Sequence, residues 1–179
     1  MKDLRSSSAL LAPALLSLAL LSACADSGPT PVMHCPDVDM LQQARTLTVF
    51  EPGRQDVAAR VTTAQLTGIS GTCKLEGDKH ALLITVQAGF EADDGPANNG
   101  AALSLPWFVA ITQGDNIISE TDYTIKLAFD GNSTAAASSQ AVKVEFPNLP
   151  ETNGTQVLVG FKMTPDQLAY AAAHPTAAP

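Results

Sequence analysis

Basic residues are scarce in this sequence. Its 179 residues include 10 Lys and Arg against 18 Asp and Glu, so the formal net charge is −8. The few basic residues form no cluster along the chain. Nucleic-acid binders need a basic patch or stripe to neutralise phosphates, so we expect no nucleic-acid partner. Anionic lipid surfaces also repel an acidic domain, so a basic patch cannot hold this chain to a membrane.

The sequence also lacks the motifs that carry common catalytic and metal chemistry. It has three His residues, no Cys-x-x-Cys pair and no phosphate-binding glycine loop. Residues 68–71 (GISG) resemble a nucleophile elbow, but the second Gly follows the Ser directly, which is the wrong spacing. Met33, His34 and Cys35 offer soft metal ligands without a second His nearby. We therefore expect no catalytic residue, no metal site and no cofactor.

The N-terminus has the features of a secretory signal in their usual order. Lys2 and Arg5 precede an uncharged, apolar run at residues 9–21. A transmembrane helix needs about 20 apolar residues, so this run is too short to span a bilayer and fits the core of a signal peptide. The tetrapeptide LSAC follows and ends at Cys24. We therefore assign residues 1–23 to a signal peptide.

The tetrapeptide LSAC resembles the lipidation motif of bacterial lipoproteins. That resemblance implies that Cys24 becomes the mature N-terminus and carries a diacylglycerol on its thiol, which anchors the chain to a membrane. Each buried methylene contributes about 0.8 kcal/mol, so two or three acyl chains hold a protein firmly. Residues 24–34 would then be the lipidated N-terminus and a linker. Ala25, rather than Asp, follows the cysteine, which favours the outer membrane over the inner membrane. The alternative is an ordinary secretory signal cut near Cys24.

With Cys24 lipidated, Cys35 and Cys73 are the two cysteines that remain. An even pair in an exported chain predicts a disulfide bond. The alternative, a metal or redox site, lacks the further Cys and His partners that it would need.

The region from Cys35 onward has the hydrophobic pattern of β-strands. Apolar and polar residues alternate with a period of two, which is typical of half-buried antiparallel strands. The clearest strands are expected at residues 82–91, 123–130, 142–146 and 157–161, and weaker ones at 46–50, 57–69 and 107–112. In the segment 57–69 the alternation changes phase near Thr62 and Thr63, which predicts a bulge or bend. Turn residues separate the strands.

This pattern predicts an all-β fold. We expect residues 35–171 to form an antiparallel β-sandwich of the immunoglobulin or fibronectin-III kind, with an open barrel as the alternative. Thr164, Pro165 and Gln167 make a capping-box pattern, which predicts a short C-terminal helix. A lone turn is the alternative there. Residues 172–179 are expected to be a disordered tail.

One loop and one aromatic pair are candidate contacts for a ligand. The acidic cluster at residues 91–95 contains Asp93 and Asp94, but it lacks the carboxylate spacing of an EF-hand, so a solvated loop is the simpler interpretation. Trp107 and Phe108 are adjacent, so on a strand they face opposite sides. We take Trp107, Asp93 and Asp94 as possible ligand contacts. The alternative is that both aromatic side chains are covered.

Several short stretches carry a resemblance to a family. They are CP at 35–36, LTVFEPG at 47–53, GISGTC at 68–73, LPWFVA at 105–110 and VGF at 159–161. Asp56, Arg60 and Val61 belong to the same pattern. Together they resemble a group of uncharacterised alphaproteobacterial envelope lipoproteins. The resemblance implies an envelope location and the cysteine pair, and it implies no activity.

These observations predict a non-enzymatic, lipid-anchored module of the cell envelope that faces the periplasm. Its expected partners are the membrane, through the acyl chains on Cys24, and an envelope protein, which it would bind or help to assemble. The alternative is a lipoprotein that binds a small ligand or a glycan.

Overall fold

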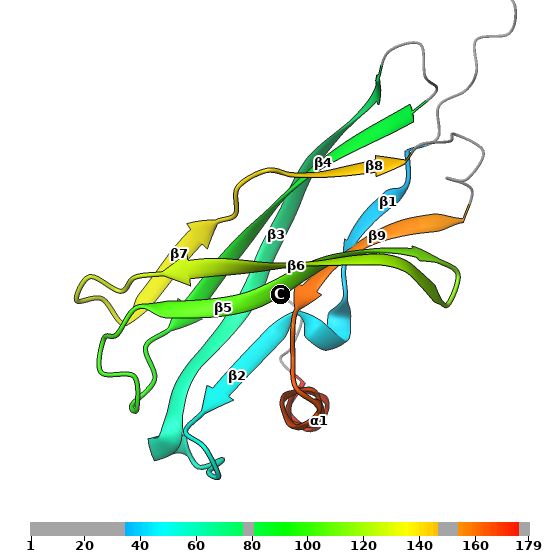
Figure 1. Ribbon diagram of the computed structural model, residues 1–179. Helices are drawn as coiled ribbons and strands as arrows, with labels where there is room; N and C mark the ends of the chain where they lie inside the picture. Colours follow the sequence, from blue (N-terminus) through cyan, green and yellow to red (C-terminus); the bar gives the residue numbers. More distant parts are fainter. Residues whose placement is uncertain (1–34, 77–80, 147–153, 176–179) are drawn as a thin grey trace, which may run out of the picture. The chain divides into compact units, whose positions relative to one another are not determined.

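The computed structural model describes residues 35–76, 81–146 and 154–175, which fold into two β-sheets and one C-terminal α-helix (Figure 1). The predicted signal peptide, Cys24 and the expected linker at 24–34 lie outside the described residues. Residues 176–179 of the expected tail do so as well.

One sheet has four strands in the order β1-β9-β5-β6. Its strands are β1 (Asp37–Met40), β9 (Thr155–Phe161), β5 (Leu103–Gln113) and β6 (Asn116–Leu127). The other sheet has five strands, in the order β2-β3-β4-β7 with β8 also paired to β4. Its strands are β2 (Thr46–Phe50), β3 (Arg60–Glu76), β4 (Ala81–Asp93), β7 (Thr134–Ser138) and β8 (Val142–Phe146).

Three helices complete the described chain. The 3₁₀ helix η1 (Gln42–Ala44) joins β1 to β2, and η2 (Val57–Ala59) precedes β3. The helix α1 (Pro165–Ala173) follows β9. None of the helices in the described part of the chain is long and apolar enough to cross a membrane.

The prediction of a mostly β fold with a short C-terminal helix is confirmed. The strands expected at 46–50 and 142–146 have those bounds. Three expectations are corrected. The short strands β1 and β7 were not predicted, because β1 has four residues and β7 (TAAAS) is made of small residues without a clear alternation of apolar and polar side chains. β1 pairs with β9 in parallel, whereas all pairs were expected to be antiparallel. Helix α1 also ends at Ala173, beyond the expected start of the tail at residue 172.

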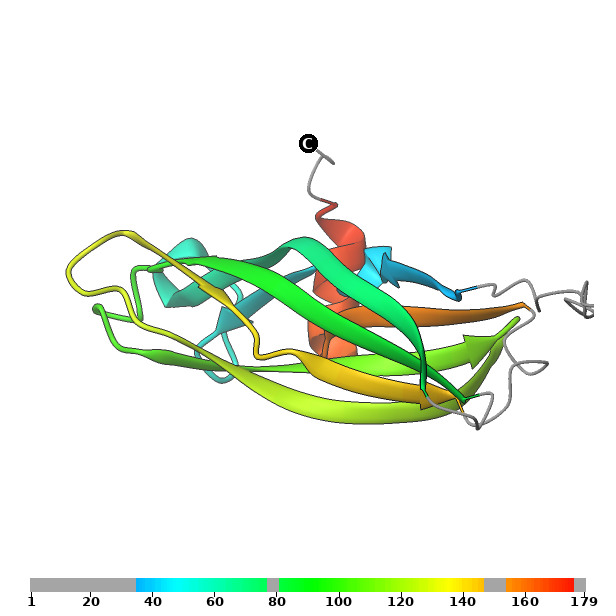
Figure 2. The same cartoon turned by 90° about the horizontal axis from the view of Figure 1, so that it is seen from above.

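The two sheets enclose one hydrophobic core. Buried residues alternate along β4 and β5 because one face of each strand points between the sheets. Phe90 of β4 lies against Trp107 of β5, with ring centroids 5.3 Å apart, and against Phe161 of β9 at 5.6 Å. All three side chains are fully buried. Figure 2 shows the strands of the two sheets in two layers. These aromatic contacts between the layers fix how the sheets face each other.

The predicted disulfide between Cys35 and Cys73 is present, with the two Cα atoms 6.2 Å apart. Cys35 lies two residues before the start of β1 of the four-stranded sheet, and Cys73 lies in β3 of the five-stranded sheet. The bond therefore joins the two layers covalently at the point where the described chain begins.

The loop after β4 is held closely against the start of β3. Gly95 N donates a hydrogen bond to Val61 O at 2.9 Å, and Ala97 N donates one to Arg60 O at 3.0 Å. A Cβ atom at Gly95 would collide with both of these carbonyl groups. Only glycine allows the backbones to approach this closely.

We expect the double substitution Cys35→Ser, Cys73→Ser to lower the free energy of unfolding. Releasing a loop that spans 38 residues costs about 4 kcal/mol in the chain-entropy model. Urea unfolding followed by the fluorescence of Trp107, the single Trp of the chain, measures this change. Dithiothreitol should shift the wild-type midpoint to that of the double variant. A reductant effect of equal size on both proteins would contradict the assignment.

We expect Gly95→Ala to destabilise the fold by about 1–3 kcal/mol, because the new methyl group must displace the backbone of β3. Gly68→Ala is the matched control. A Cβ atom at Gly68 meets nothing within 4 Å, so its effect should stay within about 0.5 kcal/mol. The same urea experiment compares the two variants, and equal losses in both would show that the loop does not need this close approach.

Candidate functional site

The C-terminal helix lies beside the edge strand β2 (Figure 1). Its first turn is fixed by the predicted capping box, in which Gln167 N donates to Thr164 Oγ1 at 3.3 Å and Thr164 N donates to Gln167 Oε1 at 2.8 Å. Two turns later, the ring of Tyr170 meets the ring of Phe50 edge to face, at a centroid distance of 5.0 Å. The cap and this aromatic contact together fix α1 against β2.

A groove of about 640 Å³ lies between α1 and the outer face of β2 and β3. Leu47 of β2 points into the core, so its neighbours Thr46 and Thr48 point outward. The strand register pairs Thr46 with Gln65 and Thr48 with Thr63. These four polar side chains form the sheet wall of the groove.

The helix wall of the groove is mainly apolar. Leu168, Tyr170, Ala171 and Ala172 of α1 line it. Leu168 is 44% exposed, although it is a large apolar residue. The groove therefore has one hydrogen-bonding wall and one apolar wall. Binding sites for small molecules combine the same two kinds of surface.

A β-bulge brings Arg60 to this groove. In the ladder between β2 and β3, Val49 pairs with Thr62 but Phe50 pairs with Arg60, so Val61 is the extra residue. Thr62 is fully buried and points inward. Without the extra residue, Arg60 would share the inward face with Thr62, because side chains alternate along a strand. The bulge predicted near Thr62 is thus confirmed, and it places a cation on the outer face.

Arg60 is held from one side by Asp93. Arg60 Nη2 lies 2.9 Å from Asp93 Oδ2, and the other carboxylate oxygen, Oδ1, accepts a hydrogen bond from Thr63 N. The Arg60 Nε atom is buried and has no hydrogen-bond partner among the described residues. A buried donor without an acceptor is uncommon in folded proteins and calls for an explanation.

Arg45 is the second cation of the groove. Its Nε atom donates a hydrogen bond to Leu66 O at 3.3 Å, which anchors the side chain to β3. The ion pairs found in the described part of the chain do not include Arg45. Its positive charge is therefore not compensated by a described carboxylate.

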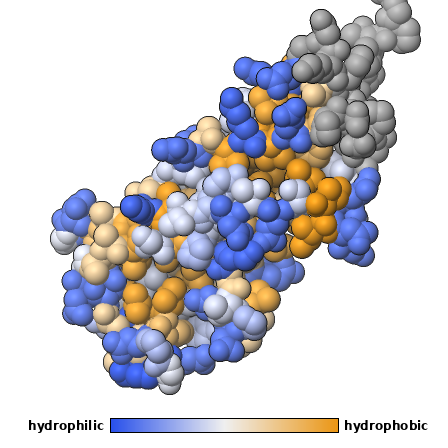
Figure 3. Space-filling model, viewed as in Figure 1, coloured by the Kyte–Doolittle hydropathy of each residue, from blue (hydrophilic) through white to orange (hydrophobic). Residues whose placement is uncertain are grey.

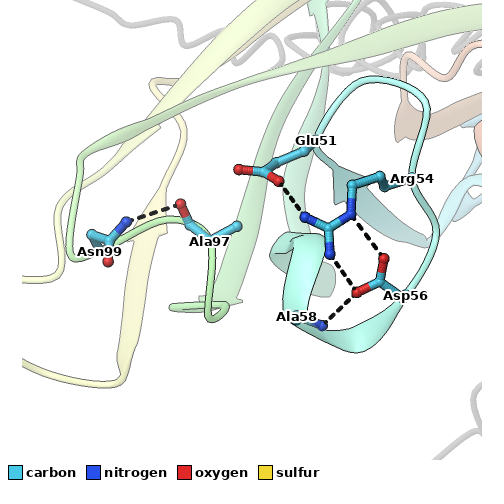
Figure 4. Close-up of polar contacts among 6 residues, drawn as sticks. All are labelled: Glu51, Arg54, Asp56, Ala58, Ala97 and Asn99. Carbon is cyan, nitrogen blue, oxygen red and sulfur yellow. Dashed lines mark hydrogen bonds and ion pairs between the residues drawn. The ribbon is translucent and has the colours of Figure 1, made fainter.

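Arg54 differs from these two arginines because its partners lie in its own segment, the connection between β2 and β3 (Figure 4). It donates hydrogen bonds to both carboxylate oxygens of Asp56, each at 2.9 Å, and to Glu51 at 3.1 Å. These bonds lower the pKa of Asp56 and raise the pKa of Arg54. Asp56 also caps η2 by accepting a hydrogen bond from Ala58 N. Arg54 is thus paired within its own turn and does not line the groove.

The ligand contact expected at Trp107 is corrected by the structure. Trp107 is 2% exposed and packs on Phe90 and on Tyr123, so a ligand at the surface cannot reach it. Phe108 faces the opposite side, as expected, and is half-buried across Gly160. The sequence showed that the two aromatic residues face opposite ways, but it did not show which face is the core.

The two acidic residues of the predicted loop have separate structural roles. Asp93 holds Arg60 at the groove. Asp94 Oδ1 accepts hydrogen bonds from Asn98 Nδ2 at 2.6 Å and from Gly100 N at 3.2 Å, which close the loop on itself. Neither residue lines the groove. In the described part of the chain, no three His, Cys, Asp or Glu side chains lie together in a way that could hold a metal ion.

Sequence reasoning missed Arg45 and Arg60 as site residues. The change of phase near Thr62 indicated the bulge that places Arg60, but it did not show what lies opposite. The groove exists only because α1 returns to β2, and this contact joins segments more than a hundred residues apart. No local pattern in the sequence encodes that contact.

We compared the chain with known families, proteins and structures. No protein-family model, no curated protein and no solved structure matches the chain.

Proposed function

We propose that this chain is a lipid-anchored, non-enzymatic binding module of the bacterial cell envelope, and that the groove beside α1 is its binding site. The observation that carries the proposal is the groove itself. Its volume of about 640 Å³ lies within the roughly 300–1,000 Å³ that is typical of small-molecule pockets. We favour a small ligand as its occupant for this reason.

The chemistry of the groove supports binding rather than catalysis. Among the described residues, no Asp, Glu, Lys or Cys lines it, so these residues form no pair of carboxylates and no activated nucleophile there. His174 contributes an imidazole to the lining, and its ring stacks on Tyr170 with centroids 4.1 Å apart. Threonine hydroxyls, glutamine amides and guanidinium groups bind and orient a ligand without reacting with it.

The membrane anchor in this proposal comes from the sequence. The apolar run and the motif ending at Cys24 support export and lipidation, and the acidic composition explains why a covalent anchor is needed. The ten residues between Cys24 and Cys35 would hold the domain close to the outer membrane, on its periplasmic side. We further propose that the two layers belong to the immunoglobulin or fibronectin-III kind of β-sandwich.

The second candidate function is docking of an envelope protein. Ile117 and Ile118, at the start of β6, support it because they are 64% and 57% exposed and adjacent. This surface is small, however. On the face drawn in Figure 3, hydrophilic residues divide the apolar ones into small patches. A stable protein interface buries about 800 Å² on each partner, so the groove has the stronger support.

We expect the full chain purified from the membrane fraction to have the mass of a chain that begins at Cys24 and carries acyl groups. Intact-mass spectrometry measures this directly. The Cys24→Ser chain is the control, because without the thiol it cannot accept the lipid and should leave the membrane fraction. An unmodified mass for the wild-type chain, or membrane retention of the variant, would contradict the anchor.

Photo-crosslinking in intact cells tests the groove. p-Benzoylphenylalanine in place of Ala172, which lines the groove, should capture the bound molecule as a small mass adduct. The same amino acid in place of Ala173, which is the next helical residue and does not line the groove, is the matched control. Adducts of the same yield at both positions, or the unmodified chain alone at Ala172, would contradict a ligand in the groove. A protein adduct there would favour the second candidate.

A further inference from the structure

We infer that the groove binds a small organic monoanion, with its carboxylate at Arg45 and its apolar or aromatic body along α1. This inference rests on the proposed function and names the class of ligand. It starts from a contrast in charge. The chain as a whole is acidic, but the described residues that line its groove include two arginines and no Asp or Glu.

The charges near the groove leave one positive charge without a partner. Arg60 is paired with Asp93, so these two charges largely cancel. Arg45 has no carboxylate among the described residues, so the groove has a local charge of one positive unit. A ligand with a single negative charge neutralises it. A doubly charged ligand would leave one negative charge without a cation to neutralise it, so it gains less from the groove than it loses in water.

The geometry of the Arg45 side chain suits a carboxylate. Arg45 uses Nε to hold Leu66 O, which fixes the side chain and leaves its two Nη groups as donors. Guanidinium groups bind carboxylates through parallel hydrogen bonds. The Nε of Arg60 is buried and its Nη2 is paired with Asp93, so Arg60 is not the main contact of the anion. A carboxylate in the groove supplies acceptors to the Nη groups of Arg45.

The remaining lining defines the rest of the ligand. Thr48, Thr63 and Gln65 on the sheet wall can bond to polar substituents. On the helix wall, Leu168 and Tyr170 offer apolar and aromatic surface. A neutral glycan would use the hydroxyl and amide groups but leave Arg45 unpaired. A purely apolar molecule would offer Thr48, Thr63 and Gln65 no hydrogen bonds, and polar groups that lose water without a new partner lower affinity.

The test compares benzoate with benzamide, its neutral isostere, on the detergent-extracted full chain. Ligand-observed NMR titration gives each dissociation constant, with protein-free detergent as the blank. We expect benzoate to bind about tenfold more tightly than benzamide, because only benzoate forms the charge-assisted pair. Phenyl phosphate, which is doubly charged near neutral pH, should bind more weakly than benzoate. Tighter binding of phenyl phosphate would overturn the choice of a monoanion.

Variants assign the effect to Arg45. Arg45→Gln should weaken benzoate about tenfold and leave benzamide unchanged, and Arg45→Lys should recover part of the loss. Arg54→Gln is the matched control, because Arg54 is an arginine outside the groove, and benzoate binding should not change. The fluorescence of Trp107 checks that each variant is folded. Benzoate binding that is unaffected in Arg45→Gln would overturn the inference.

The outcomes separate the ligand class from the proposed function. If benzoate and benzamide bind equally, and crosslinking at Ala172 captures a small adduct while crosslinking at Ala173 does not, the groove is a binding site but its ligand is not an anion. If neither compound binds and crosslinking at Ala172 captures nothing, the groove itself is not a binding site. Neither result bears on the proposed lipid anchor at Cys24, which intact-mass spectrometry tests separately.

Discussion

The antiparallel ladder between β3 and β4 supports most of the structure. It runs from the pair Ala64 and Ala92 to the pair Glu76 and Ala81, and each of its two strands carries further elements. β2 pairs with β3 on one side, and β7 and β8 pair with β4 on the other. The inward face of this ladder packs on the four-stranded sheet, and β3 also carries Cys73 of the disulfide. The core, the covalent link between the layers and the groove all depend on this one register.

Strand alternation and its interruption at Val61 together produce the groove. Alternation buries Leu47 and Ala64 and turns the neighbouring threonines and glutamine outward. The bulge at Val61 then reverses the phase, so that Arg60 lies on the outer face with them. A bulge costs ladder hydrogen bonds, and such irregularities occur often beside functional sites, where they redirect a side chain. The loop that begins at Asp93 stabilises the result, because it pairs with Arg60 and its backbone bonds to the bulged segment.

The charge distribution gives the acidic domain two distinct surfaces. If the chain is anchored as proposed, anionic headgroups would repel most of the surface of the acidic domain, and the acyl anchor at Cys24 would determine its position. The groove is the local exception, since Arg45 and Arg60 are the permanently charged side chains among the described residues that line it. Arg60 is paired with Asp93, whereas Arg45 has no carboxylate partner among the described residues. Arg54 is also paired, through hydrogen bonds that stay within its own turn. Arg54 therefore has a structural role, and Arg45 carries a charge that a ligand could neutralise.

The sequence by itself determined the properties that depend on neighbouring residues. The alternation of apolar and polar residues predicted most of the strands. The pattern from Thr164 to Gln167 predicted the helix cap, and the number of cysteines predicted the disulfide bond. Tertiary structure decided which side of each strand is the core, so Trp107 is buried and Phe108 is not. It also decided that α1 returns to β2 and that β1 joins β9 in parallel. These outcomes depend on contacts between segments that are far apart in the sequence. Such contacts are stabilised by the burial of apolar surface, and the local sequence pattern does not specify which surfaces are buried together.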